Sequence, residues 1–307
     1  MSGPASLVER QRFLNLLEAF AGESHRRLLR ASGDQEAWET ARRFLDRQGF
    51  DLAQLDLVPV GLFLDCPTMQ ESLRLAGFTP SEIEASELAA DPRLAGRLVG
   101  PIRDLDGSIR SFWARHPVPK RPQYLFKGRW KEDVPAFGLD VAFPALDDGR
   151  LPLVLIEGLL DVLLLQFHGF LHVAAIGGDG THLTRRRWEK LAHLGVRRAI
   201  LVLRPDEIGL RGAAAAQANA RGARLAPDVS VLPPERLEGF ASPGEFVRAR
   251  GISAFRALFE PRVELPPAEP HPPAEKSPPK ALVADGCPRP GFCALHRCDE
   301  TDCFCFD

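Results

Sequence analysis

The 307-residue sequence has no long apolar run, and this absence excludes several classes of protein. A membrane-spanning helix needs about 18 consecutive apolar residues. The longest candidate, LPLVLIEGLLDVLLLQF, is interrupted by Glu157, Gly158 and Asp161. The opening residues, MSGPASLVERQRF, contain no apolar core of a secretory signal. We therefore predict a cytoplasmic protein with no membrane partner.

A strong overall charge is also absent, because the formal net charge is only −2. Positive charge is nevertheless concentrated between Arg97 and Lys131, where nine basic residues stand against two acidic ones, with aromatic residues among them. Cations interleaved with aromatic rings suit the phosphates and bases of nucleic acid. This stretch predicts a nucleic-acid surface, with an ordinary solvated face as the alternative. The candidate contacts are Arg97, Arg103, Arg115, Lys120, Lys127 and Arg129.

Cysteine is nearly absent from the body of the chain, where Cys66 stands alone, but five cysteines crowd the last 21 residues. Residues 261–280 hold eight prolines and predict a semi-rigid spacer before this tail. Crowded thiols in a cytosolic chain indicate metal binding before disulfides. Zinc binding can fold a segment that has little apolar sequence, and a disordered or redox-labile tail is the alternative. The candidate zinc ligands are Cys287, Cys293, Cys298, Cys303, Cys305 and His296.

The hydrophobic periodicity divides the rest of the chain into two parts. Residues 1–149 predict a subdomain that is helical at first and then basic and rich in strands. In it, Ser81 and Glu84 have the spacing of a capping box. Two strands around 97–116 are joined by a turn at Asp106-Gly107, and a basic loop follows to about residue 135.

Residues 150–257 alternate between apolar strands and helices, as in LPLVLIEG, HVAAIGG, RRAILVLRPDEIG and DVSVLPP. This alternation predicts an α/β fold with a mostly parallel sheet and helices on both faces. Ligands of such sheets bind at the carboxyl ends of the strands, where Glu157, Asp179 and Asp206 stand. The predicted linker covers residues 258–284, and the predicted zinc tail covers residues 285–307.

Several motifs in their order resemble the catalytic core of bacterial-type (DnaG-like) DNA primases with a TOPRIM domain. LVLIEGLLDVLLLQFHGF, AAIGG and AILVLRPDEIGLRGA are similar to the TOPRIM segments, and RLVGPIRDLDGSIRSFWAR is similar to the segment upstream. QYLF and FGLDVA stand where the family has two further short motifs. The resemblance covers roughly residues 10–255.

The resemblance implies a site for phosphoryl transfer. It places Glu157 at the family's catalytic glutamate, Asp161 at the acid one helical turn later, and Asp206 at the second acid of an Asp-x-Asp pair that holds magnesium. Glu157, Asp161 and Asp206 are thus the implied catalytic residues. The implied partners are single-stranded DNA or another nucleic acid, and nucleotides. Carboxylates and substrate phosphates are the ligands that magnesium prefers.

This sequence departs from the family pattern at two places. Arg204 replaces the first acid of the Asp-x-Asp pair, and SPGE places Ser242 and Gly244 where the family has acids after its fourth strand. A positive charge at ~4 Å from a cation costs about 4 kcal/mol at an effective dielectric of 20. We therefore expect weakened magnesium binding.

Three interpretations of this departure remain open. In the first, Asp179 supplies the missing ligand, and magnesium is held by Glu157, Asp179 and Asp206. Arg204 could instead clamp a phosphate, because guanidinium suits bidentate phosphate contacts. It could also form only a surface ion pair with Asp206 or Glu207.

The main functional hypothesis is a primase-like protein that binds DNA or nucleotides through its basic residues and Arg204, with primer synthesis weakened or lost. The first alternative is an active, compact primase that makes RNA primers on single-stranded DNA with magnesium. The second alternative is a TOPRIM nuclease. For the cysteine-rich tail two roles stay open, a reader of the template or a docking segment for a replication or helicase protein.

Overall fold

The computed structural model describes residues 7–31, 33–127, 134–147 and 149–259. Its first part, residues 7–127, is called here the N-terminal lobe and contains an antiparallel sheet in the order β1-β2-β3-β4. The predicted hairpin is confirmed, because β2 and β3 pair antiparallel around a turn in which Gly107 has φ +80°. The strands are β1 (Gly61–Phe63), β2 (Arg97–Arg103), β3 (Ile109–Arg115) and β4 (Tyr124–Lys127).

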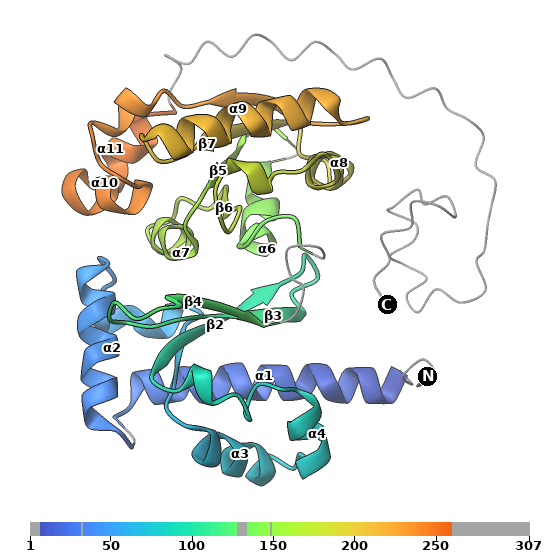
Figure 1. Ribbon diagram of the computed structural model, residues 1–307, viewed down its shortest axis with the longest axis vertical. Coiled ribbons are helices and arrows are strands. Elements are labelled where there is room, and N and C mark those ends of the chain that lie inside the picture. The colour runs from blue at the N-terminus through green and yellow to red at the C-terminus, as the bar shows by residue number, and fades with distance from the viewer. Residues whose placement is uncertain (1–6, 32, 128–133, 148, 260–307) are drawn as a thin grey trace, which may run out of the picture. The chain divides into compact units, whose positions relative to one another are not determined.

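Helix α1 (Leu7–Leu29) packs along this sheet, as Figure 1 shows, and buries Leu16, Leu17 and Phe20 against it. Phe20 lies edge-on to Phe112 of β3, with 5.0 Å between the ring centroids. The predicted helical start of the chain is therefore confirmed. The other helical segments of this lobe are α2 (Gln35–Arg47), η1 (Leu52–Leu57), α3 (Cys66–Leu75), α4 (Pro80–Ala85) and η2 (Pro92–Leu94).

Two local predictions for this lobe were wrong. The capping box of α4 is formed by Thr79 and Glu82, not by Ser81 and Glu84. The proline at 80 occupies the first turn of the helix, where a missing N–H is tolerated, so the helix begins two residues earlier than expected. Part of the predicted basic loop is in fact β4, which pairs with β3 from Phe112 to Arg115.

The C-terminal lobe, residues 134–258, contains a parallel sheet in the order β6-β5-β7-β8. The predicted α/β class with a parallel sheet is confirmed. Its strands are β5 (Leu153–Ile156), β6 (Val173–Ala175), β7 (Arg198–Val202) and β8 (Asp228–Val231). Its helical segments are α6 (Leu139–Ala142), η3 (Phe143–Leu146), α7 (Leu159–Phe167), η4 (Gly180–His182), α8 (Arg185–His193), α9 (Glu207–Gly222), η5 (Pro234–Leu237), α10 (Pro243–Arg250) and α11 (Ile252–Ala257).

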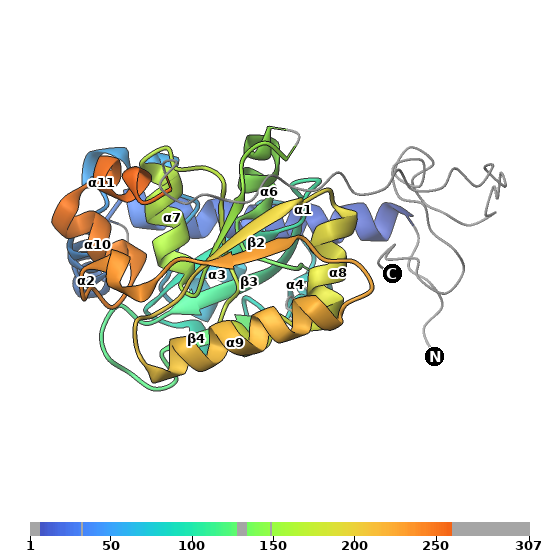
Figure 2. The same cartoon turned by 90° about the horizontal axis from the view of Figure 1, so that it is seen from above.

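Helices cover both faces of the parallel sheet. Successive side chains of a strand point to opposite faces, and all four residues of β5 are buried. Leu153 and Leu155 pack with residues of α8 and α9, including Trp188 and Ala216. Helix α7 packs against β6 and α10. Figure 2 shows α9 with α8 at one side of the sheet and α7 with α10 at the other.

The two lobes contact each other where α2 ends. Phe50 lies 5.9 Å from Phe167 of α7 between ring centroids, and Arg248 of α10 donates to the carbonyl of Gln48 at 3.5 Å. The described residues from Leu7 to Leu258 cluster as one unit. Within the described residues no helix is both long and apolar enough to cross a membrane.

Candidate functional site

The carboxyl ends of two neighbouring strands supply the central polar groups of the site. Glu157 directly follows β5, while Arg204 and Asp206 follow β7, the strand beside it. Arg204 Nε lies 3.0 Å from Asp206 Oδ2 and 4.0 Å from Glu157 Oε2. The guanidinium therefore stands between the two carboxylates. The ion pair with Asp206, which was one of the open alternatives, is present.

Glu157 has an unusual environment for a carboxylate. Its side chain is 24% exposed, and its Oε1 is buried without a hydrogen-bond partner. Burial raises the pKa of Glu157 to about 7, although the charge and backbone N–H of Arg204 oppose the rise, and Asp206 and Asp179 add to it. Near neutral pH, this carboxyl is divided between its ionised and protonated forms, so it can donate or accept a hydrogen bond.

Asp206 and Asp179 each begin a helical segment. Asp206 Oδ1 accepts the N–H of Gly209 at 2.9 Å and caps α9. Asp179 Oδ1 accepts the N–H of Thr181 at 3.0 Å and caps η4, and these hydrogen bonds hold the pKa of Asp179 below its usual value. Each of these carboxylates thus already accepts a backbone hydrogen bond as the N-cap of a helical segment.

Asp161 is directed to a different element. It lies on α7 and accepts hydrogen bonds from the hydroxyl of Ser242 and the N–H of Gly244, at the first turn of α10. A Cβ at Gly244 would overlap the carboxylate, with Arg248 also close by. Ser242 and Gly244 stand where the resemblance expects two acids. They provide the hydrogen-bond donors and the space that accommodate the Asp161 carboxylate.

These contacts fit a divalent cation poorly. Among the residues that the structure describes, no three His, Cys, Asp or Glu side chains gather closely enough to hold a metal ion. Arg204 places positive charge between Glu157 and Asp206, and Asp161 is engaged with α10. Magnesium binding at Glu157, Asp179 and Asp206 stays a prediction.

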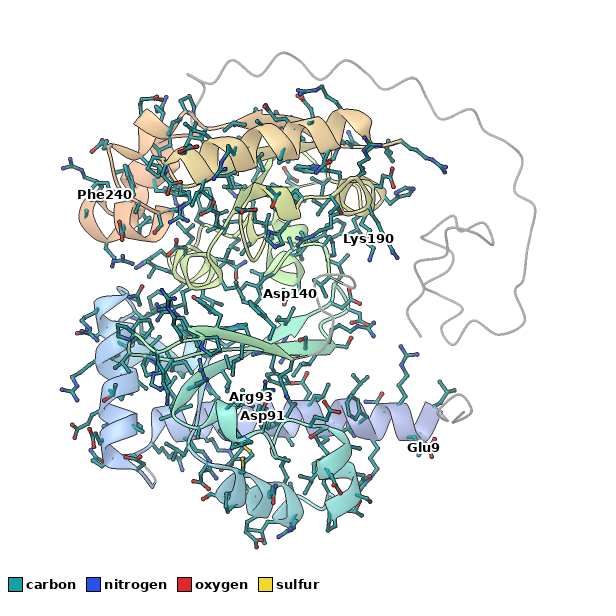
Figure 3. All side chains as sticks on the ribbon, viewed as in Figure 1. Glu9, Asp91, Arg93, Asp140, Lys190 and Phe240 are labelled. Atoms are coloured by element: carbon teal, nitrogen blue, oxygen red, sulfur yellow. The ribbon has the colours of Figure 1, made fainter. Side chains whose placement is uncertain are left out.

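Three of the predicted nucleic-acid contacts are already used inside the protein. Arg97 is 3% exposed, and its guanidinium donates to the carbonyls of residues 93, 122 and 123. Lys127 Nζ lies 2.9 Å from the buried carboxylate of Asp91, which also forms an ion pair with Arg93 at 2.8 Å. Figure 3 labels Asp91 and Arg93 on the N-terminal lobe. Arg103 forms an ion pair with Glu18 of α1 at 2.5 Å. Arg97 is thus a structural residue, and the other two are neutralised.

Arg115 is held differently, between aromatic rings. Its guanidinium lies over Phe44 of α2 at 4.2 Å and over Tyr124 of β4 at 5.5 Å from the ring centroids. Burial raises the pKa of Tyr124, and the charge of Asp161 adds to this rise. Tyr124 in turn stacks with Phe126 at 6.2 Å.

The remaining predicted residues divide into two groups. Lys120 is exposed to solvent, and Arg204 keeps 43% of its side chain exposed within the site. The other predicted residues lie outside the part of the chain that the structure describes, and they stay predictions. They are Arg129, Cys287, Cys293, His296, Cys298, Cys303 and Cys305.

The sequence did not predict the contact of Tyr124 with Arg115 or that of Gly244 with Asp161. Tyr124 is the one tyrosine of the chain, and it was counted only as one aromatic among basic residues. The signal for Gly244 was present, because Ser-Pro-Gly-Glu has the residue types of a helix start, with serine at the cap and proline at the first turn. The start of a helix presents free backbone N–H groups that can donate hydrogen bonds to a carboxylate.

Comparison with known proteins places this geometry in context. No protein-family model matches the chain. It is 30% identical over 161 residues to a DNA primase of Deinococcus radiodurans, a match that covers 49% of this chain and 28% of that protein. It is 28% identical over 245 residues to a DNA primase of Streptomyces coelicolor, covering 74% of this chain and 37% of that protein. The matches thus span well under half the length of either relative.

Solved structures match over more of the chain. The RNA polymerase domain of Mycobacterium tuberculosis primase DnaG superposes with a TM-score of 0.64 at 25% identity, covering 81% of this chain and 82% of that one. The zinc-binding and RNA polymerase domains of Aquifex aeolicus primase give 0.66 at 19% identity, covering 83% and 61%. In both sequence and fold, the chain is a homologue of DnaG-type DNA primases that has the architecture of their catalytic core.

Proposed function

We propose that this protein binds nucleic acid at the carboxyl edge of its parallel sheet, with Arg204 in the place of a divalent cation, and that primer synthesis is weak or lost. The observation that carries the proposal is the position of the Arg204 guanidinium between Asp206 and Glu157. Two related primase structures support the choice of partner. One is a DnaG catalytic domain bound to single-stranded DNA, and the other is the Mycobacterium tuberculosis domain in complex with double-stranded DNA.

Arg204 has the properties of a phosphate-binding group. Asp206 holds its Nε at 3.0 Å, and this contact orients the planar guanidinium while 43% of the side chain stays exposed. The remaining N–H groups can donate two parallel hydrogen bonds to a phosphate. Glu157, when protonated, adds a donor to the same oxygen atoms. The site thus binds an anion with groups that the chain itself supplies.

Binding and turnover make different demands on this site. Phosphoryl transfer relies on neutralising the charge that spreads over the transferred group and its leaving oxygen. A fixed guanidinium carries one positive charge and cannot lower the pKa of a bound hydroxyl as a metal does. With Asp161 engaged by α10, the chain keeps two acids beside an arginine. We therefore expect retained binding and a large loss of synthesis.

The proposal is tested by binding with and without metal. The fluorescence anisotropy of a labelled single-stranded DNA should give the same Kd in EDTA as in magnesium. Arg204→Ala should weaken binding by about tenfold or more, because a charged hydrogen bond contributes roughly 1.5–3 kcal/mol. Arg43→Ala is the matched control, since Arg43 is an exposed arginine on α2 whose ion-pair partner, Glu39, lies 4.0 Å away. It should change Kd by less than about twofold.

A synthesis assay separates this proposal from its alternatives. Primer synthesis with nucleotides and magnesium that is abolished by Glu157→Gln would identify an active primase instead. Metal-dependent nicking of DNA would identify a nuclease. Arg204→Asp restores the acid that the primase pattern has at this position. This variant should bind manganese more tightly than the wild type, which is measured as a decrease in the electron paramagnetic resonance signal of the free ion. It should also weaken DNA binding in EDTA.

A further inference from the structure

The far end of α9 carries a second group of cations, at a distance from Arg204. Arg221 and Arg224 lie at the end of this helix and just beyond it, and Arg185 and Arg186 begin α8. All four are exposed. Arg221 lies fifteen positions after Asp206 along α9, a rise of about 22 Å. We call these four residues the α8–α9 patch.

The two helices meet closely at this patch, as Figures 1 and 2 both show. A Cβ at Gly222 would lie 2.8 Å from Arg185 Nε, so the guanidinium of Arg185 covers the last turn of α9. The backbone N–H of Arg224 donates to Glu189 Oε1 of α8 at 2.9 Å. The cations of the two helices therefore form one surface and not two separate ones.

The patch keeps a surplus of positive charge. Two acids lie at the patch. Glu189 accepts the Arg224 backbone N–H, and the exposed Asp228 lines a pocket together with Arg221. In the described part of the chain, Arg185, Arg221 and Arg224 form no ion pair with a carboxylate. Exposed arginines that lack partners are suited to bind phosphates bidentately.

The patch also lacks aromatic side chains. Trp188 is the one aromatic residue between positions 180 and 230, and it is buried with its indole donating to the carbonyl of Ala216. Single-stranded nucleic acid is bound by stacking its bases on aromatic rings, whereas a duplex hides its bases and offers phosphates. The stacked Tyr124 and Phe126 of β4 supply such rings on the N-terminal lobe instead.

We propose that the α8–α9 patch binds the phosphate backbone of a nucleic-acid duplex that extends along α9 from the site at Arg204. The proposal rests on the proposed function, because it gives a second contact for the same nucleic acid. A path of about 22 Å corresponds to six or seven base pairs at roughly 3.4 Å per base pair. Arginines at the end of α9 also suit the negative end of its helix dipole, and the test has to separate this structural role from binding.

The test compares a labelled duplex of about 14 base pairs with the matching single strand, by anisotropy at several salt concentrations. The double variant Arg221→Glu/Arg224→Glu should weaken duplex binding by about tenfold or more. It should reduce the slope of log Kobs against log salt by about two units, because two phosphate contacts are lost. Single-strand binding should change by less than about twofold. Arg43→Glu/Arg74→Glu, on exposed arginines of α2 and α3, is the matched control and should change neither.

A second variant separates binding from the dipole effect. Arg185→Glu/Arg186→Glu places the same charge change on α8 and replaces no residue of α9, and it should produce the same loss of duplex binding. Unchanged duplex binding in both double variants, or an equal loss in the control, would overturn the inference while the proposed function stands. A wild-type protein that binds neither duplex nor single strand would contradict both the proposed function and this inference.

Discussion

Gly244 lies directly against the carboxylate of Asp161, so close that a single Cβ would overlap Oδ1. The backbone N–H of Gly244 donates to that carboxylate, as does the hydroxyl of Ser242. The missing side chain thus permits α7 and α10 to be joined by hydrogen bonds to the partly buried carboxyl group of Asp161, whose pKa is raised by burial. The same contact engages an acid that the primase pattern assigns to catalysis.

Gly244→Ala should therefore destabilise the C-terminal lobe. The added methyl group has to displace either Asp161 or the first turn of α10, and this leaves a partly buried carboxylate with fewer donors. We expect a loss of about 2–4 kcal/mol in the free energy of unfolding, measured by urea denaturation. Gly22→Ala is the control, because Gly22 lies within α1 and an added Cβ would meet no atom beyond its own helix within 4 Å. It should be neutral, or stabilising by up to about 1 kcal/mol. An equal stability of the two variants would contradict the proposed contact.

Glu157→Gln should change how stability depends on pH. The pKa of Glu157 is about 7 in the folded protein, against an ordinary value of 4.5, so between these values the folded state binds more protons than the unfolded state. The contribution of Glu157 to the free energy of unfolding of the wild type therefore falls as pH rises from 4.5 to 7. Above this range the contribution stays constant. The glutamine variant lacks this loss. Relative to the wild type, it should gain about 2 kcal/mol between pH 4.5 and pH 8, measured by denaturation at both values. A difference that does not vary with pH would show that Glu157 titrates normally.

The sequence predicts the framework of the site well. The alternation of apolar strands and helices indicates a parallel sheet, and such a sheet gathers Glu157, Arg204 and Asp206 at the ends of neighbouring strands. Position in a strand is a property of the local pattern, and this is why these residues could be found without coordinates. The hairpin from Arg97 to Arg115 was predicted for the same reason, since its turn residues are adjacent in the sequence.

The sequence does not show which charged side chains are free to bind a ligand and which are engaged in contacts within the protein. Arg97 has the same residue type as Arg204, but it folds back onto three backbone carbonyls, one of them 26 residues away. Asp161 has the expected place on α7, but its partner is a helix start some 80 residues later. Pairings of this kind depend on tertiary distance, which composition and periodicity do not encode.

Arg187 should be more important for stability than its exposed neighbours. It is 5% exposed, and its guanidinium donates to the carbonyls of Pro135, Ile176 and His182, which joins the start of the C-terminal lobe to α8. Burial lowers the pKa of Arg187 to about 10, which still leaves it charged at neutral pH. Arg187→Met removes the donors and leaves three carbonyl groups buried, so we expect a loss of about 3–5 kcal/mol in urea denaturation.

The matched control for this change is Arg211→Met. Arg211 keeps 70% of its side chain exposed on α9, and its variant should stay within about 0.5 kcal/mol of the wild type. If the two methionine variants were equally stable, the buried guanidinium would not hold these segments together.

The start of α4 offers a direct test of the corrected capping box. Thr79 Oγ1 accepts the N–H of Glu82 at 3.3 Å, and the Glu82 carboxylate accepts the Thr79 N–H at 2.7 Å. Thr79→Ala removes the cap and should cost about 0.5–2 kcal/mol in the free energy of unfolding. Ser81→Ala tests the position that the sequence suggested, and it should cost less than about 0.5 kcal/mol because Ser81 is exposed and caps no N–H group in the described structure. Denaturation of the two variants side by side decides between the registers, and a larger loss for Ser81→Ala would restore the original assignment.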